Sequence, residues 1–171
     1  LKYNEEWGKK KLKKERVLVE FVSSNPTGPL HIGHARGAVL GNIISNLLSN
    51  QGYEVTKEYY VNDAGRQINI LALSIMLETF QNNINKEGLY QGDYIKDLAK
   101  KFMAAKLVNE VNNPLEKFSD DSDERIDQLI SHYKKDSPET WNLIRDFSVN
   151  EMIKLIKDDL SRMEILHDEW F

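Results

Sequence analysis

The chain has 171 residues, of which 40% are hydrophobic and 29% charged, a composition typical of a globular domain and unlike that of a disordered tail or a fibre. A chain of this length forms one domain, or one domain with an insertion, and can build a real core. It contains no cysteine, which excludes a disulfide framework, a thiolate zinc site and a cysteine nucleophile and fits a reducing cytoplasm. No stretch of about 18 apolar residues occurs, so we expect neither a membrane span nor an export signal.

Charge is distributed unevenly along the chain. Residues 1–16 contain seven basic and three acidic residues, although the whole chain has a net charge of −4. Clustered lysines can neutralise the phosphates of a nucleic acid, but short lysine runs usually lie free in water. We therefore favour a solvated linker ahead of the first strand, with a nucleic-acid contact as the alternative.

The first predicted element is a buried strand at residues 16–23, a short apolar run with β-branched and aromatic residues. An ionised Glu20 inside that strand would be costly unless a cation paired with it. A structural ion pair with Arg36 or Arg66 is one way to satisfy it. The sequence SNPTGP at residues 24–29 then predicts a tight loop.

An amphipathic helix is predicted after this loop. Apolar residues recur at spacings of three and four from His34 onward, and Gly52 stands where a helix would end. Residues 53–61 alternate and are rich in Val, Thr and Tyr, as in a strand. Strand, loop, helix and strand form a βαβ unit with a parallel pair, and ligands gather at the carboxyl ends of such strands. The loop at residues 24–29 lies at that end.

The rest of the chain is predicted to be mainly helical, because apolar residues recur along one face of each segment. The expected helices span residues 66–82, 93–112, 123–135 and 138–163. An acidic loop is expected at residues 114–123. The sequence EILHDEWF at residues 164–171 is typical of the beginning of a strand, and it ends on two large rings without a following partner. We interpret the chain as a fragment of a longer protein.

The candidate chemistry lies at His31, Gly33 and His34, directly after the loop and at the start of the helix. Two histidines three residues apart place imidazole donors beside free backbone amides, and the helix dipole adds about half a positive charge there. Gly33 lets backbone or ligand approach closely. The pattern predicts an anion site whose donors stabilise charge developing on a transferring phosphate. The alternatives are a turn residue with a helix cap, or a zinc site, which the absence of a third nearby ligand disfavours.

Two segments, EFVSSNPTGPLHIGHARGAVLGN and EYYVNDAGRQI, resemble the catalytic domain of the class I aminoacyl-tRNA synthetases, and specifically that of bacterial arginyl-tRNA synthetases. The first segment carries the HIGH signature of that class at residues 31–34, and its lead-in SSNPTGPL is particular to the arginine enzymes. The resemblance is strong over residues 16–80. It implies an α/β fold, namely a Rossmann-like parallel-sheet nucleotide-binding half-domain with a mainly α-helical insertion.

The resemblance also implies roles for individual residues. In the family, the signature histidines contact the ATP phosphates, and the glycine lets adenine lie against the backbone. Carried over by position, the catalytic residues are His31 and His34, the ATP-binding residues are Ile32, Gly33 and Thr27, and the arginine-binding residues are Glu20 and Asn25. ATP would enter with Mg²⁺ as a substrate, and we expect neither a tightly bound cofactor nor a protein-built metal site.

The order of domains in the family implies a division of this chain. Residues 1–15 would be a linker from a missing N-terminal domain, 16–83 the first half of the catalytic domain, 84–163 the helical insertion, and 164–171 the start of a strand leading into the missing second half. The family's second signature, the lysine-containing KMSKS loop, is absent from this sequence. Some arginine enzymes carry a substitute lysine in the lead-in to HIGH, where this chain has Gly28, so we expect the full-length protein to keep its own KMSKS lysine.

The resemblance implies that the full-length parent is an arginine–tRNA ligase. It would activate L-arginine with ATP to arginyl-adenylate and then transfer arginine to tRNA(Arg). We expect a cytoplasmic monomer with no membrane partner, and an inactive fragment when this chain is isolated. The enzymatic alternatives are another class I synthetase or a nucleotidylyltransferase, and the non-enzymatic alternative is a fragment that binds nucleotide only, or binds nothing.

Overall fold

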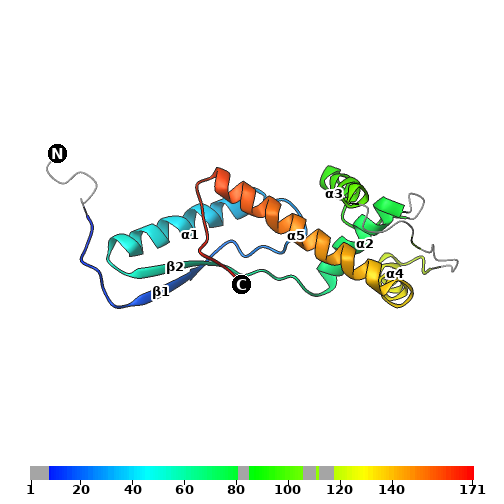
Figure 1. Cartoon of the computed structure of the whole chain (residues 1–171), viewed down its shortest axis with the longest axis horizontal. Coiled ribbons are helices and arrows are strands. Elements are labelled where there is room, and N and C mark those ends of the chain that lie inside the picture. The colour runs from blue at the N-terminus through cyan, green and yellow to red at the C-terminus, as the bar shows by residue number, and fades with distance from the viewer. Residues whose placement is uncertain (1–7, 81–84, 106–110, 112–117) are drawn as a thin grey trace. The chain divides into compact units, whose positions relative to one another are not determined.

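The computed structural model describes residues 8–80, 85–105, 111 and 118–171. In chain order its elements are β1 (Arg16–Glu20), α1 (Ile32–Asn50), β2 (Glu54–Tyr59), α2 (Arg66–Phe80), α3 (Asp93–Ala104), α4 (Ser122–Asp136), α5 (Pro138–Arg162) and β3 (Glu169–Trp170) (Figure 1). The three strands form one sheet in the order β1-β2-β3, and both pairs are parallel. The predicted α/β class is confirmed.

The chain divides into two compact units. The sheet unit contains the segments Leu1–Asn25, Leu30–Asn62 and Leu155–Phe171. The helical unit contains Pro26–Pro29 and Asp63–Lys154, so the loop ahead of α1 belongs to it. The long helix α5 contributes its first part to the helical unit and its last part to the sheet unit.

In the sheet unit, α1 is the crossover between β1 and β2 and packs against both strands (Figure 1). The core beneath it consists of buried apolar side chains from α1, from β2, from the residue after β1 and from the end of α5 and the segment that follows it. They are Phe21, Ala38, Tyr59, Ile156, Leu160 and Ile165. The close approach of α1 depends on Gly41, because a Cβ atom there would lie 2.2 Å from Cγ of Phe21. The predicted βαβ unit is therefore present, with its helix close against the first strand.

The first strand is shorter and more exposed than its sequence predicts. It ends at Glu20 rather than at Ser23, because Val22 and Ser23 adopt left-handed backbone angles with φ of 68° and 40°. Side chains along β1 alternate between exposed and half-buried, and Leu18 is 59% exposed. The expectation of a buried strand is wrong for the described chain. The left-handed turn is what redirects the backbone into the loop.

The described part of the basic N-terminal segment, residues 8–16, is hydrogen-bonded through its backbone. The amides of Lys10 and Lys13 donate to the carbonyls of Asn50 (2.8 Å) and Gly52 (2.7 Å) at the end of α1. Gly52 has a φ of +88°, and a Cβ atom there would lie 2.1 Å from the carbonyl oxygen of Lys11. The side chains of residues 8–16 are all exposed. The favoured linker is thus solvated in its side chains but attached through its main chain.

The last residues form the short strand β3, as predicted. The amide of Phe171 donates to the carbonyl of Tyr59 (3.0 Å), and the ring of Trp170 stacks on that of Tyr59 with centroids 4.3 Å apart. Trp170 therefore has a partner within the chain, contrary to the sequence-based expectation, whereas Phe171 is 79% exposed. His167 contacts the same cluster, with its ring centroid 4.2 Å from that of Phe21.

The helical unit has a core of its own between α2, α3, α4 and the first part of α5. Its largest fully buried side chains are Phe102, Ile68, Leu71, Leu73, Ile75, Met76, Leu77, Ile126, Leu129, Tyr133 and Trp141. The predicted helices are confirmed in the described residues, and α4 begins at an Asp121 cap whose carboxylate accepts from the amide of Glu124 at 2.9 Å. Residues 106–110 and 112 of the helix predicted at 93–112, and residues 114–117 of the acidic loop predicted at 114–123, lie outside the described residues. In the part of the chain that is described, every helix is too short or too polar to cross a bilayer.

Candidate functional site

The candidate site is built on the start of α1, where His31 is the N-cap. His31 has an extended backbone, with φ of −117° and ψ of 172°, and its Nδ1 accepts a hydrogen bond from the amide of Gly33 at 3.1 Å. The ring of His34 returns the contact, because its Nδ1 accepts from the amide of His31 at 3.3 Å. This reciprocal pair satisfies two of the amides that a helix start leaves unpaired. The cap role weighed in the sequence is thus present in the structure.

The caps fix where the imidazole protons lie. A neutral imidazole has one acceptor nitrogen and one donor nitrogen. Since Nδ1 accepts in both rings, the proton of each neutral ring is on Nε2, the nitrogen that the caps do not use. The two rings stack with their centroids 3.7 Å apart and their planes 20° apart. Capping and anion binding are therefore compatible uses of the same two side chains.

The electrostatics of the site favour a neutral His34 ring beside a positive helix end. Burial first, and the neighbouring His31 ring second, lower the pKa of His34 below its usual 6.5. The first turn of α1 contains no acidic side chain, so nothing on it opposes the positive end of the helix dipole. The site can consequently offer N–H donors near neutral pH without carrying two imidazolium charges.

Gly33 has a structural explanation that sequence reasoning did not give. A Cβ atom at this position would lie 2.9 Å from Cε1 and 3.0 Å from Nδ1 of His31. Any larger residue would push the His31 ring out of its capping position. Ile32, the neighbouring ATP-binding candidate, is 81% exposed.

The segments that follow β1 and β2 meet through polar contacts. The Tyr59 hydroxyl donates to the carbonyl of Ser24 at 2.9 Å and lies 2.7 Å from the Ser24 hydroxyl. The side-chain amide of Asn62 donates to Oδ1 of Asn25 at 3.1 Å. Sequence reasoning singled out Asn25 but missed Tyr59 and Asn62, although both belong to the YYVND segment at the carboxyl end of β2. Parallel pairing of β1 and β2 is the signal that could have found them.

Glu20 is at the carboxyl end of β1, and its side chain is exposed. The Glu20 carboxylate is therefore not desolvated, contrary to the expectation from the sequence. Arg66 forms ion pairs with Asp123 (2.8 Å) and Asp127 (3.1 Å) instead. Within the described ranges no ion pair joins Glu20 to Arg36. The strand register places Glu58 of β2 beside Glu20, a second acidic position that sequence reasoning missed.

Thr27 is held in the helical unit, where its carbonyl accepts a hydrogen bond from the Tyr94 hydroxyl at 3.2 Å. The structure thus brings His31, Gly33 and His34 together at one helix end. Asn25 lies in a contact with the loop after β2.

An open apolar groove of about 710 Å³ begins at this helix end and runs along α1. Its lining includes Ile32, Gly33, Arg36, Val39, Leu40 and Ile43. Exposed apolar side chains in such a continuous row are typical of a surface that another segment or partner covers. Within the described residues, no group of three or more His, Cys, Asp or Glu side chains is arranged to hold a metal ion.

Comparisons with known proteins show what the whole chain is similar to. Residues 1–166 match the family model described as "tRNA synthetases class I (R), catalytic domain". The arginine–tRNA ligases of Vesicomyosocius okutanii and Nitrosospira multiformis are 41% and 40% identical over 165 and 167 residues, in each case 92% of this chain but 29% of the relative.

Solved structures give the same result. The Campylobacter jejuni arginyl-tRNA synthetase structure superposes with a TM-score of 0.71 at 37% identity, covering 97% of this chain and 32% of that chain. The Thermus thermophilus arginyl-tRNA synthetase has a TM-score of 0.57 at 20% identity, covering 95% of this chain and 24% of that one, and supports the fold alone. The chain spans less than a third of the length of each of these relatives.

Proposed function

Because the chain belongs to the family of class I arginyl-tRNA synthetase catalytic domains, we propose that it supplies the half of an active site that carries the HIGH signature. The longer protein would activate L-arginine with ATP and then transfer arginine to tRNA(Arg). The observation that carries this proposal is the start of α1, where His31 and His34 use Nδ1 for capping and keep Nε2–H as a donor. The family match argues against the alternatives of a nucleotidylyltransferase and of a synthetase for another amino acid.

In the activation step, a carboxylate oxygen of arginine attacks the α-phosphorus of ATP. A new P–O bond forms, the bond to the β,γ-diphosphate breaks, and pyrophosphate leaves. Negative charge on the transferring phosphate is redistributed in the transition state, and N–H donors held at a helix start can stabilise it. His31 and His34 need to move no proton for this role. Mg²⁺ would arrive with the ATP phosphates.

Substrate contacts are assigned on the same basis. Ile32, Gly33 and Thr27 would bind ATP, and Glu20 and Asn25 would bind arginine. An exposed carboxylate at the carboxyl end of β1 suits a guanidinium, because its planar fork can donate two parallel hydrogen bonds to one carboxylate. Glu58, next to Glu20 in the register, would add a second negative charge that favours a cationic substrate.

The exposed groove on α1 supports a site completed by chain outside this sequence. Val39, Leu40 and Ile43 are each roughly half exposed, and a catalytic half-domain would cover them with its second half. tRNA(Arg) would bind through the full-length protein, which we propose acts as a cytoplasmic monomer in translation.

The test uses the full-length protein that contains this chain. Exchange of labelled pyrophosphate into ATP, measured with tRNA present, should depend on L-arginine and should not occur with L-lysine or without amino acid. Arginylation of tRNA(Arg) should accompany it. Exchange that is equally fast with lysine, or absent with arginine, would refute the proposal.

A further inference from the structure

The loop that precedes the signature is held by a tyrosine of the helical unit. The Tyr94 hydroxyl donates to the carbonyl of Thr27 at 3.2 Å. A Cβ atom on Gly28 would lie 3.6 Å from that hydroxyl and 3.8 Å from Cζ, which is ordinary van der Waals contact. Pro26, which precedes Thr27 in the loop, is buried. The Tyr94 side chain thus hydrogen-bonds to Thr27, and its hydroxyl end lies close to the space that a side chain at Gly28 would enter.

Tyr94 is itself firmly placed. It is the second residue of α3 (Asp93–Ala104), and its neighbours Ile95 and Leu98 are buried at 3% and 4% exposure. Gly92, the N-cap of α3, has a φ of +132°, and a Cβ atom there would lie 3.4 Å from Cδ1 and Cε1 of the Tyr94 ring. A side chain at Gly92 would therefore pack directly on the Tyr94 ring, and a side chain at Gly28 would meet its hydroxyl end.

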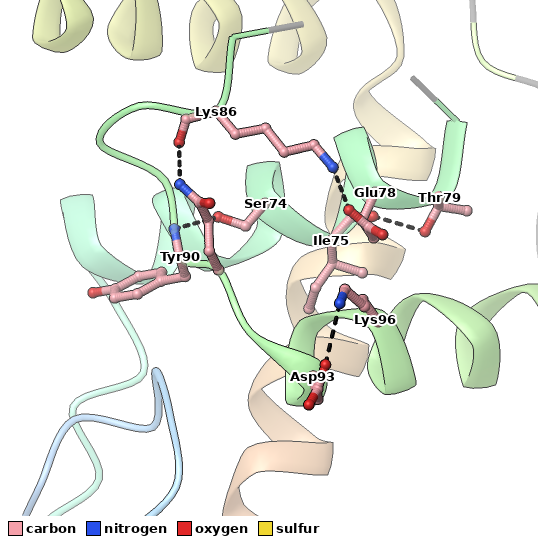
Figure 2. A network of polar contacts seen from close by, with 9 residues as sticks. Ser74, Ile75, Glu78, Thr79, Lys86, Tyr90, Asp93 and Lys96 are labelled. Atoms are coloured by element: carbon pink, nitrogen blue, oxygen red, sulfur yellow. Dashed lines mark hydrogen bonds and ion pairs between the residues drawn. The ribbon is translucent and has the colours of Figure 1, made fainter. Parts of the chain in front are cut away.

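The segment before α3 is attached to α2, as Figure 2 shows. The amide of Tyr90 donates to the hydroxyl of Ser74 at 3.0 Å, and this buried hydroxyl donates to the carbonyl of Ile70 at 2.7 Å. Lys86 forms an ion pair with Glu78 of α2. These contacts fix the start of α3, and hence Tyr94, to the core of the helical unit.

Tyr94 also keeps its proton. Burial first, and the nearby Tyr90 second, raise the pKa of Tyr94 above its usual 10.0. The Tyr94 hydroxyl therefore stays neutral, and able to donate to a carbonyl, over the whole physiological pH range.

We infer that Tyr94 is a positioning residue that sets the conformation of the loop between Asn25 and His31. This inference rests on the proposed function, in which Asn25 binds arginine and His31 binds the ATP phosphates. Pro29 is separated from His31 by Leu30 alone, and Pro26 directly follows Asn25. A shift of the loop backbone therefore reaches Asn25 through one peptide bond and His31 through two.

The inference is tested with Tyr94→Phe in the full-length protein. This change removes the hydroxyl and keeps the ring. Tyr133→Phe is the matched control, because the Tyr133 hydroxyl is buried in the same unit and has no hydrogen-bond partner among the described residues. Two readouts are taken, namely amide hydrogen exchange of peptides covering residues 24–31 and the single-turnover rate of adenylate formation at subsaturating ATP.

We expect Tyr94→Phe to speed exchange in the loop peptides and to lower the rate about two- to tenfold, the usual net effect of one hydrogen bond. The melting temperature and the Tyr133→Phe control should stay near the wild-type values. Unchanged loop exchange in Tyr94→Phe would overturn the inference, as would an equal loss of rate in Tyr133→Phe. If exchange in the loop rises but the wild-type protein fails to activate arginine, the positioning stands and the proposed function fails.

Discussion

Replacing Gly33 by alanine should leave the stability of α1 nearly unchanged but impair catalysis at its start. The added Cβ would lie 2.9 Å from Cε1 of His31, and the exposed imidazole ring can avoid this contact by rotating away. Rotation breaks the hydrogen bond from the Gly33 amide to Nδ1 and the stack on His34. The backbone itself needs no rearrangement.

The expected effect on folding is small, because two effects oppose one another. Loss of an N-cap costs about 1 kcal/mol, and alanine in place of glycine in a helix gains up to about 1 kcal/mol. Gly37 lies on the same helix, and a Cβ atom there would meet no atom within 4 Å, so Gly37→Ala reports the gain alone. Urea unfolding of the 171-residue chain should place Gly33→Ala near the wild type and Gly37→Ala about 1 kcal/mol above it.

The expected effect on catalysis is large. Removing one donor from a site that stabilises developing charge costs about 100-fold or more, and rotation of His31 displaces that donor. Single-turnover adenylate formation by full-length Gly33→Ala should therefore fall at least about tenfold. If Gly33→Ala stabilises the chain as much as Gly37→Ala does and forms adenylate at the wild-type rate, the His31 ring is not displaced and the predicted role of Gly33 is wrong.

Three further predictions concern pH, substrate choice and completeness. Burial lowers the pKa of His34 and of His167 below 6.5, so the unfolded chain binds protons more readily than the folded chain. The contribution of these two histidines to stability is therefore full above about pH 6.5 and is lost as pH falls through their lowered pKa values. The urea midpoint of unfolding should decrease on acidification, and it should decrease less in His167→Gln. A urea midpoint that rises on acidification would contradict this prediction. Glu20→Gln in the full-length protein should raise the KM for arginine at least about tenfold, while the KM for ATP and the melting temperature stay constant. A lower melting temperature with an unchanged KM for arginine would show that the Glu20 carboxylate has a structural role instead. The isolated 171-residue chain should show no arginine-dependent pyrophosphate exchange near the parent's rate, because each missing 1.4 kcal/mol of barrier stabilisation costs about tenfold, and rapid turnover would disprove it.

The order of elements was predictable because local signals mark their limits. Periodicity indicated α1, and its cap follows from a histidine pair at the right spacing. The early end of β1 was not predictable, since Val22 and Ser23 have left-handed angles that non-glycine residues rarely adopt. Glu20 was assigned a buried position because periodicity alone cannot tell an edge strand from a central one.

Contacts between distant positions were also beyond sequence reasoning. Trp170 stacks on Tyr59, and the Tyr94 hydroxyl reaches Thr27 across 67 positions of the chain. No local sequence pattern shows which aromatic side chain contacts which loop. The helix start at residues 31–34 was predictable from the change of period after the loop, but the use of Nδ1 for capping, which determines the donor nitrogen, needed the structure.

His31→Asn in the full-length protein distinguishes histidines that act through Nε2–H from histidines that serve as caps alone. Asparagine is a good N-cap acceptor, so the unfolding midpoint should be unchanged, but its short side chain places no donor where Nε2 was. Single-turnover adenylate formation should fall at least about tenfold in His31→Asn. It should recover in part in His31→Gln, whose longer side chain brings an amide donor nearer that position. A wild-type rate in His31→Asn would show that His31 is a helix cap only.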